Sequence, residues 1–235
     1  MGRYASRSKF CEVVLNGEYM GVYVLFEKIK RDVNRVNIKK LEAPDTSGNA
    51  LTGEYIIKID KIDGENNSGW YSNYLPYAQS PNKVLYQYHY PKPDEIVAQQ
   101  KSYIQNKIFA FETIMKYSTN ISDSATGYLK YINSDSFVNF ILVNEITKNV
   151  DAYRLSTYLY KNRDDIDPRI YACPVWDFNL GFGNANYYDG WKTDEWQLEY
   201  LTDYTTNQSG EYFLTPFWWR KLFDDTKFRN KMYKR

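Results

Sequence analysis

The residues best suited to chemistry are two aspartates, Asp151 and Asp177, which share the stretch 149–183. Asp151 comes shortly after a segment predicted to form a buried helix, and Asp177 directly follows a predicted strand. Two carboxylates that converge at the ends of such elements can hold Mg²⁺, which takes a few carboxylate oxygens together with phosphate and water. The metal offsets charge on a transferring phosphoryl group. The stretch therefore predicts a centre that handles metal and phosphate.

The spacing around both aspartates matches, in degenerate form, two motifs of phosphoryl transfer. Ser156 stands five positions after Asp151, as the metal-binding residue does in the kinase catalytic loop H-R-D-x-x-x-x-N. Phe178 follows Asp177, as in the D-F-G motif whose Asp binds Mg²⁺. We expect Asp151 to orient an attacking hydroxyl, and Asp177 and Ser156 to bind the metal. The departures from the motifs are Asn149 and Val150 in place of His-Arg, and Asn179 in place of glycine.

A phosphotransfer site also needs a cation for the nucleotide phosphates. Lys28 is the first candidate because it ends a predicted strand, and Glu54 is a candidate partner for it. No G-x-G-x-x-G loop and no G-x-x-x-x-G-K-[ST] loop is present in the sequence. The further candidates for phosphate contacts are Lys30, Lys58, Arg7 and Arg154.

Each of these residues has an ordinary structural explanation when it is taken alone. An aspartate after a helix is usually a cap or loop residue, and a lysine at a strand end is usually a solvated charge. His89, the only histidine, lies at a predicted strand end and is expected to be structural. The combination of the two aspartates with the serine, after a strand-rich part of the chain, carries the prediction.

The rival hypothesis is a non-catalytic module that binds a carbohydrate or a partner protein. It is motivated by the aromatic content of 24 Tyr, 12 Phe and 6 Trp, since these side chains also suit binding surfaces. Their ordinary role is packing in the core and at interfaces. A nucleotidyl or sugar transferase is a third hypothesis, because a fold does not fix the acceptor. The tryptophans in question are Trp70, Trp191, Trp196, Trp218 and Trp219.

Bulk properties bound these hypotheses. A chain of 235 residues fits one large domain or one two-lobed domain. The net charge of +1 argues against general electrostatic binding to nucleic acid. The sequence contains no run of 18 apolar residues, so it predicts no membrane segment. Cys11 and Cys173 do not have metal-ligand spacing. We expect two buried free thiols, because an unpaired cysteine behaves as a small core hydrophobe; the alternative is a single disulfide.

The order of the predicted elements suggests two parts. Residues 1–90 are rich in strands, the Tyr-Pro-Lys-Pro stretch from Tyr90 breaks regular structure, and residues 91–235 are rich in helices. The segment 19–28 is apolar on both faces and predicts a central strand, joined to 9–16 by a turn at Asn16-Gly17. The other predicted strands cover 53–60, 83–90, 157–161 and 170–176, and the predicted helices cover 93–117, 134–148 and part of 218–223.

This plan predicts an α+β fold of the minimal protein-kinase type. The small lobe, 1–90, would be an antiparallel sheet, and the large lobe, 91–235, would be helical and carry Asp151 and Asp177. ATP would lie at the junction, near 88–91. Because Met1-Gly2 leads almost directly into strand sequence, we expect the small lobe to be truncated at its N-terminal side.

The sequence resembles the CotH kinase family, named for a bacterial spore-coat protein. The most specific part of the resemblance is the block Leu15-Asn16-Gly17-Glu18-Tyr19-Met20-Gly21-Val22-Tyr23. The other matching segments are Ala5 to Ser8, Glu27 to Ile29, Gly53 to Asp60, Tyr90-Pro91, Asn149 to Asp151, and Trp176 to Asn179.

The resemblance implies an atypical kinase that binds ATP and Mg²⁺ and phosphorylates Ser or Thr of a protein acceptor. It implies Asp151 and Asp177 as the acidic pair of the active site. It also implies an extracytoplasmic setting such as a cell surface, a secreted protein or a spore coat.

Overall fold

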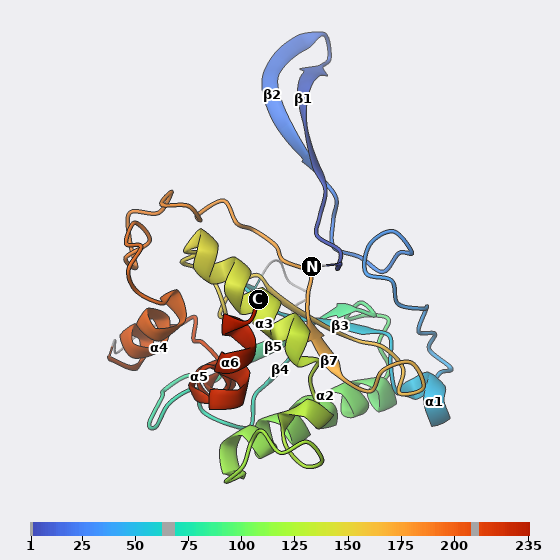
Figure 1. Ribbon diagram of the computed structural model, residues 1–235. Helices are drawn as coiled ribbons and strands as arrows, with labels where there is room; N and C mark the ends of the chain where they lie inside the picture. Colours follow the sequence, from blue (N-terminus) through green and yellow to red (C-terminus); the bar gives the residue numbers. More distant parts are fainter. Residues whose placement is uncertain (1, 63–68, 208–211) are drawn as a thin grey trace.

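The computed structural model describes residues 2–62, 69–207 and 212–235 (Figure 1). These residues form two antiparallel sheets and six α-helices, which confirms a mixed fold of helices and antiparallel strands. One sheet has two strands and the other has five. The active-site candidates follow elements of the larger sheet and of the helix that packs beside it.

The five-stranded sheet joins early and late parts of the chain. Its order is β4-β5-β3-β6-β7, so β3 pairs with an early strand on one side and a late strand on the other. The residues 1–90 therefore do not complete this sheet alone. The bounds are Tyr55–Ile59 for β3, Gly69–Tyr71 for β4, Leu85–Tyr90 for β5, Thr157–Lys161 for β6 and Ile170–Ala172 for β7.

The central strand β3 is covered on both faces. Tyr55, Ile57 and Ile59 belong to the main core, whereas Ile56 packs into a second cluster formed by residues of the segment 29–38. Alternate residues of a strand point to opposite faces, so an almost continuous apolar strand fits a position with cover on each side. The end of β3 is thereby held rigidly, and Asp60 follows it directly.

The main core is an aromatic cluster between the helices and the sheet. The ring centroid of Phe137 on α3 lies 5.2 Å from that of Trp219 and 5.9 Å from that of Trp218. Both tryptophans are on α5 and are fully buried. These two tryptophans therefore serve packing and offer no binding surface. The helix bounds are Gly48–Leu51 for α1, Ala98–Tyr117 for α2, Ser134–Thr147 for α3, Gln197–Asn207 for α4, Phe217–Asp224 for α5 and Thr226–Tyr233 for α6.

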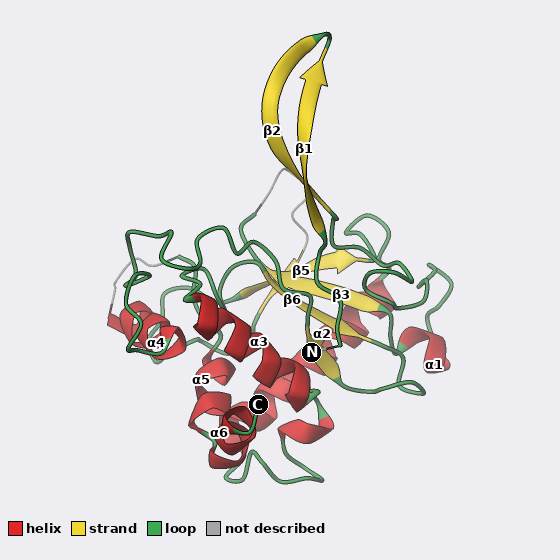
Figure 2. Cartoon of the chain, turned by 45° about the horizontal axis from the view of Figure 1, so that its top comes forward, coloured by secondary structure: helices red, strands yellow, loops and turns green. Residues whose placement is uncertain are grey.

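The predicted hairpin is confirmed, but the prediction of a central strand is wrong. The strands β1, Ser8–Leu15, and β2, Glu18–Phe26, pair only with each other and project away from the rest of the molecule (Figure 2). Val22 is 64% exposed and Leu25 is 66% exposed. Apolar residues on both faces of a strand do not determine whether it has a neighbouring strand on one side or on both.

Other boundaries also differ from the predictions. α2 begins at Ala98 because the residues from Pro93 onward form turns, and β7 ends at Ala172, just before Cys173 and Pro174. Both thiols are free and Cys173 is buried, as expected, but Cys11 is half-exposed, so the expectation that it is buried is wrong. The strand β4 lies between the predicted strands 53–60 and 83–90, where no strand was predicted, and residues 63–68 lie outside the described part. The helices α4 and α6 were not predicted.

His89 has the structural role expected of it: its ring contacts the carbonyl oxygen of Ile29 at 2.9 Å and meets Tyr158 edge-on. Among the described helices, none has both the length and the apolar character needed to cross a membrane.

A buried carboxylate lies inside the aromatic core. Glu112 of α2 is 2% exposed and accepts hydrogen bonds from Ser72 Oγ at 2.9 Å and Tyr86 OH at 2.8 Å. Trp218 Nε1 in turn donates to Tyr86 OH at 3.0 Å. Burial raises the pKa of Glu112 to about 7, although the bonds from Tyr86 and Ser72 oppose the shift. The folded state therefore binds the Glu112 proton more tightly than the unfolded state does.

We expect Glu112 to make the protein less stable as pH rises. The folded-state pKa lies above the unfolded value, so its contribution is complete below pH ~4.5 and is lost as pH rises towards ~7. The loss should approach about 3 kcal/mol. Urea unfolding from pH 4.5 to 8 should show this fall in wild type and a flatter curve in Glu112→Gln. The exposed control Glu18→Gln should follow wild type, and parallel curves for all three proteins would contradict the prediction.

Candidate active site

The loop after α3 is fixed by its own side chains. Lys148 adopts a left-handed conformation, with φ of 50°, which ends the helix. The buried Asn149 donates to Asn144 Oδ1 at 3.0 Å and accepts from the backbone N–H of Asp151 at 3.2 Å. Asn149 therefore stabilises the turn that presents Asp151, a role that needs neither residue of the His-Arg pair.

Asp151 is half-buried at the start of this turn. Arg154 lies beside it, with 3.8 Å between the guanidinium and Asp151 Oδ1. Burial raises the pKa of Asp151, and the charges of Asp177 and Asp60 add to the rise while Arg154 and Lys61 oppose it. A carboxylate in this environment is a better proton acceptor than a solvated one.

Ser156 links two further carboxylates. Its Oγ lies 3.5 Å from Asp177 Oδ2, and its backbone N–H donates to Asp60 Oδ1 at 3.3 Å. The structure thus brings the predicted residues Asp151, Ser156 and Asp177 into one cluster. Ser156 and Asp177 have φ of 48° and 62°, a left-handed conformation that non-glycine residues seldom adopt and that is often found at functional sites.

Asp60 is the site residue that the sequence interpretation missed. It directly follows β3, and Lys58 Nζ lies 3.4 Å from its Oδ2. The signal was present, since Asp60 ends an apolar predicted strand just as Asp177 does.

The donors in the cluster suit Mg²⁺. Asp177 is exposed, and the serine hydroxyl lies next to it, so both can offer oxygen to a hard cation. Within the described residues, no three His, Cys, Asp or Glu side chains form a ready-made metal site.

An apolar hollow of about 640 Å³ adjoins Asp177. Its walls come from the hairpin base and from the segment after β7, including Phe26, Val175 and Trp176. Phe26 and Trp176 meet edge-on, with 6.4 Å between ring centroids. We call this space the Asp177 hollow.

A basic hollow of about 480 Å³ shares Phe26 with the Asp177 hollow. Arg7 and Lys28, two of the predicted phosphate contacts, both line it. The Arg7 guanidinium donates two hydrogen bonds to the Glu27 carboxylate, at 2.7 and 3.0 Å, and these bonds lower the pKa of Glu27 to about 2. The other cations around this hollow are Lys9, Lys30 and Arg35.

Two other residues predicted for the phosphate-binding group, Arg154 and Glu54, lie outside the basic hollow. Arg154 has only 2% of its side chain exposed, stacks on the Tyr188 ring at 4.5 Å and lines a different hollow. Glu54 precedes β3, at the other end from Asp60; its carboxylate accepts from the backbone of Lys39 at 2.8 Å and lies 3.7 Å from Arg163. Glu54 is therefore not the partner of Lys28, and the prediction that paired them is wrong.

The family model described as CotH kinase protein matches residues 1–235, which is the whole chain. The chain therefore belongs to the CotH kinase family, as the resemblance in its motifs indicated. No curated protein and no solved structure matches it.

The charges of Asp177 and Asp60 both act unfavourably on Asp151, so removing the charge of Asp177 should stabilise the metal-free protein. Asp177→Asn should raise the free energy of unfolding by about 0.5 kcal/mol at low ionic strength. Asn also tolerates the left-handed backbone at this position. Urea unfolding without metal measures the change, with Asp94→Asn on an exposed turn as control. A gain that persists undiminished in 1 M salt would point to a cause other than charge repulsion.

Proposed function

We propose that this chain is a CotH-like kinase domain that transfers phosphate from Mg·ATP to Ser or Thr of a protein acceptor. The observation that carries the proposal is the convergence of Asp151, Ser156 and Asp177 in a chain of this family. Phosphoryl transfer depends mainly on positioning and on electrostatic stabilisation of charge. The cluster offers both, next to a basic hollow.

Each residue has a distinct proposed role. Asp177 and Ser156 would hold Mg²⁺, which when bound would neutralise charge on the phosphates. Asp151, with its raised pKa, orients the acceptor hydroxyl and accepts its proton. The Asp177 hollow takes the apolar face of the nucleotide, and the adjoining cations take its phosphates.

The kinase-like division into two lobes belongs to the same proposal. The hairpin and the segments up to β5 would contribute the small lobe, 1–90. Its sheet would be completed by β6 and β7 of the large lobe, 91–235. Tyr90 packs into the small cluster that also receives Trp176, which supports a nucleotide site close to the predicted junction at 88–91. We also propose the extracytoplasmic setting that the family resemblance implies.

Both aspartates should be required for transfer. Asp151→Asn and Asp177→Asn should each lower Mg·ATP-dependent phosphorylation of a Ser/Thr protein acceptor by at least about 100-fold. Asp177→Asn should also weaken Mg·ATP binding in calorimetry, while Asp151→Asn should leave that binding nearly intact. Asp94→Asn is the matched control. Unchanged transfer in either variant would sink the assignment, and no heat with Mg·ATP in wild type would favour the non-catalytic module.

Lys28 and Lys58 are the two candidates for contact with the nucleotide phosphates. Lys28 lines the basic hollow and is exposed, whereas Lys58 lies within the carboxylate cluster at 3.4 Å from Asp60. Lys28→Met should raise the KM for ATP about 10-fold, and Lys39→Met, on an exposed lysine outside this hollow, should not. A larger rise in Lys58→Met than in Lys28→Met would transfer the role to Lys58.

A further inference from the structure

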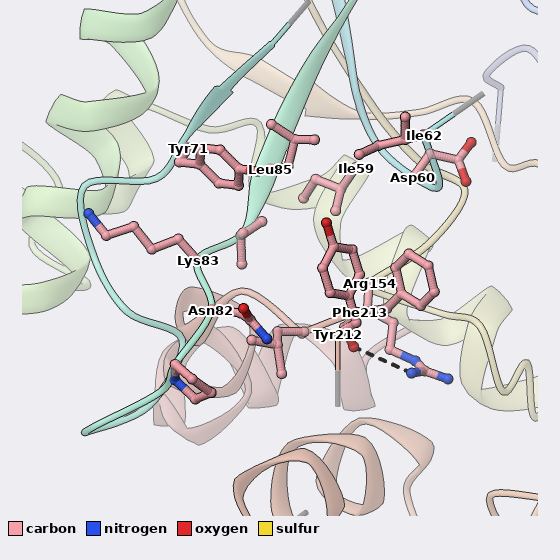
Figure 3. A pocket seen from close by; sticks show the side chains of 13 residues that line it. Ile59, Asp60, Ile62, Tyr71, Asn82, Lys83, Leu85, Arg154, Tyr212 and Phe213 are labelled. Atoms are coloured by element: carbon pink, nitrogen blue, oxygen red, sulfur yellow. Dashed lines mark hydrogen bonds between the residues drawn. The ribbon is translucent and has the colours of Figure 1, made fainter. Parts of the chain in front are cut away.

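A third hollow, of about 400 Å³, adjoins the carboxylate cluster of Asp60, Asp151 and Asp177, since Asp60 is one of its lining residues (Figure 3). Most of its wall is apolar and comes from the ends of β3, β4 and β5 and from the segment that precedes α5. Tyr71 and Leu85 face into it from paired positions on neighbouring strands. Asp60 and Arg154 also line this space, and we call it the Arg154 hollow.

The Arg154 hollow is continuous with the catalytic candidates. The Arg154 guanidinium lies 3.8 Å from Asp151 Oδ1. Asp60 accepts from the backbone of Ser156, whose hydroxyl lies beside Asp177. A molecule in this hollow would therefore lie one residue away from the group assigned to the acceptor hydroxyl.

The two hollows beside the carboxylates differ in chemistry. The Asp177 hollow shares Phe26 with the basic hollow, whose cations suit a polyanionic nucleotide. The Arg154 hollow shares no lining residue with either of them. Its buried cation, Arg154, lies beside Asp151. Asp60, Asn82 and the exposed Lys83 also line it, and the other nine lining residues are aliphatic or aromatic. A transferase must hold two substrates at one centre, and these surfaces are suited to different ones.

We propose that the Arg154 hollow binds a bulky apolar side chain of the acceptor polypeptide, close in sequence to the phosphorylated hydroxyl. This inference rests on the proposed kinase function and specifies its acceptor. The volume lies at the low end of the roughly 300–1,000 Å³ typical of ligand pockets, so it suits one or two large side chains of an extended segment. Anchoring an apolar residue there brings the neighbouring hydroxyl to Asp151.

Tyr71 offers the sharpest test because it is 55% exposed and tolerates change without loss of the core. Fluorescein-labelled peptides carry one Ser and vary at one flanking position among Phe, Leu, Ala, Glu and Lys. Wild type should bind and phosphorylate the Phe or Leu peptides about 10- to 100-fold better than the Ala peptide at one such position. Tyr71→Lys should abolish that preference and favour the Glu peptide instead.

The controls separate this inference from the kinase function. Tyr71→Phe should retain the apolar preference, and Tyr233→Lys, on the exposed Tyr233 of α6, should behave as wild type. The KM for ATP should stay constant in all four proteins. Transfer with the same peptide preference in Tyr71→Lys and wild type would overturn the Arg154 hollow but leave the kinase function intact. Tyr71-dependent peptide binding without transfer would support the hollow and sink the kinase function.

Discussion

The structure depends on one strand that is buried on both faces. β3 pairs with β5, from the early part of the chain, and with β6, from the late part, so it holds the two together. Its apolar side chains fill the main core on one side and the 29–38 cluster on the other. Such burial stabilises by about 25 cal/mol per Å² of apolar surface. The carboxyl end of the same strand leads into Asp60.

The loops of the candidate site are held in place by this rigid frame. The left-handed conformations of Ser156 and Asp177 cost about 1–3 kcal/mol each in non-glycine residues, so the surroundings must impose them. Ser156 immediately precedes β6, whose Thr157 is paired with Ile59 of β3. The ladder therefore fixes the chain direction at the point where the serine turns towards both carboxylates. Positioning by a sheet is more precise than positioning by a free loop.

The sequence was sufficient for those parts of the site whose spacing is local. The proximity of Asp151, Ser156 and Asp177 could be predicted because a helix and two strands end close to one another and place them there. Asp60 was missed because its role depends on β3 lying beside β6, a contact across about a hundred residues of sequence. Glu54 failed for the same reason, since its partner Arg163 comes from a distant turn. The pairing of strands is non-local, and periodicity within one segment does not specify it.

The hairpin shows a different limit of sequence patterns, and it bears on how the site works. Both its faces are apolar, yet it stands apart from the five-stranded sheet and meets the body at its base. There Phe26 contacts Trp176, and Glu27 joins Arg7 to Arg35. The cations of the basic hollow are thus carried by the hairpin base and the segments beside it, whereas the carboxylates are carried by the packed core. In a phosphotransferase this arrangement lets the phosphate-binding side adjust to the nucleotide while the acid side stays fixed, because only the core is held by extensive apolar packing.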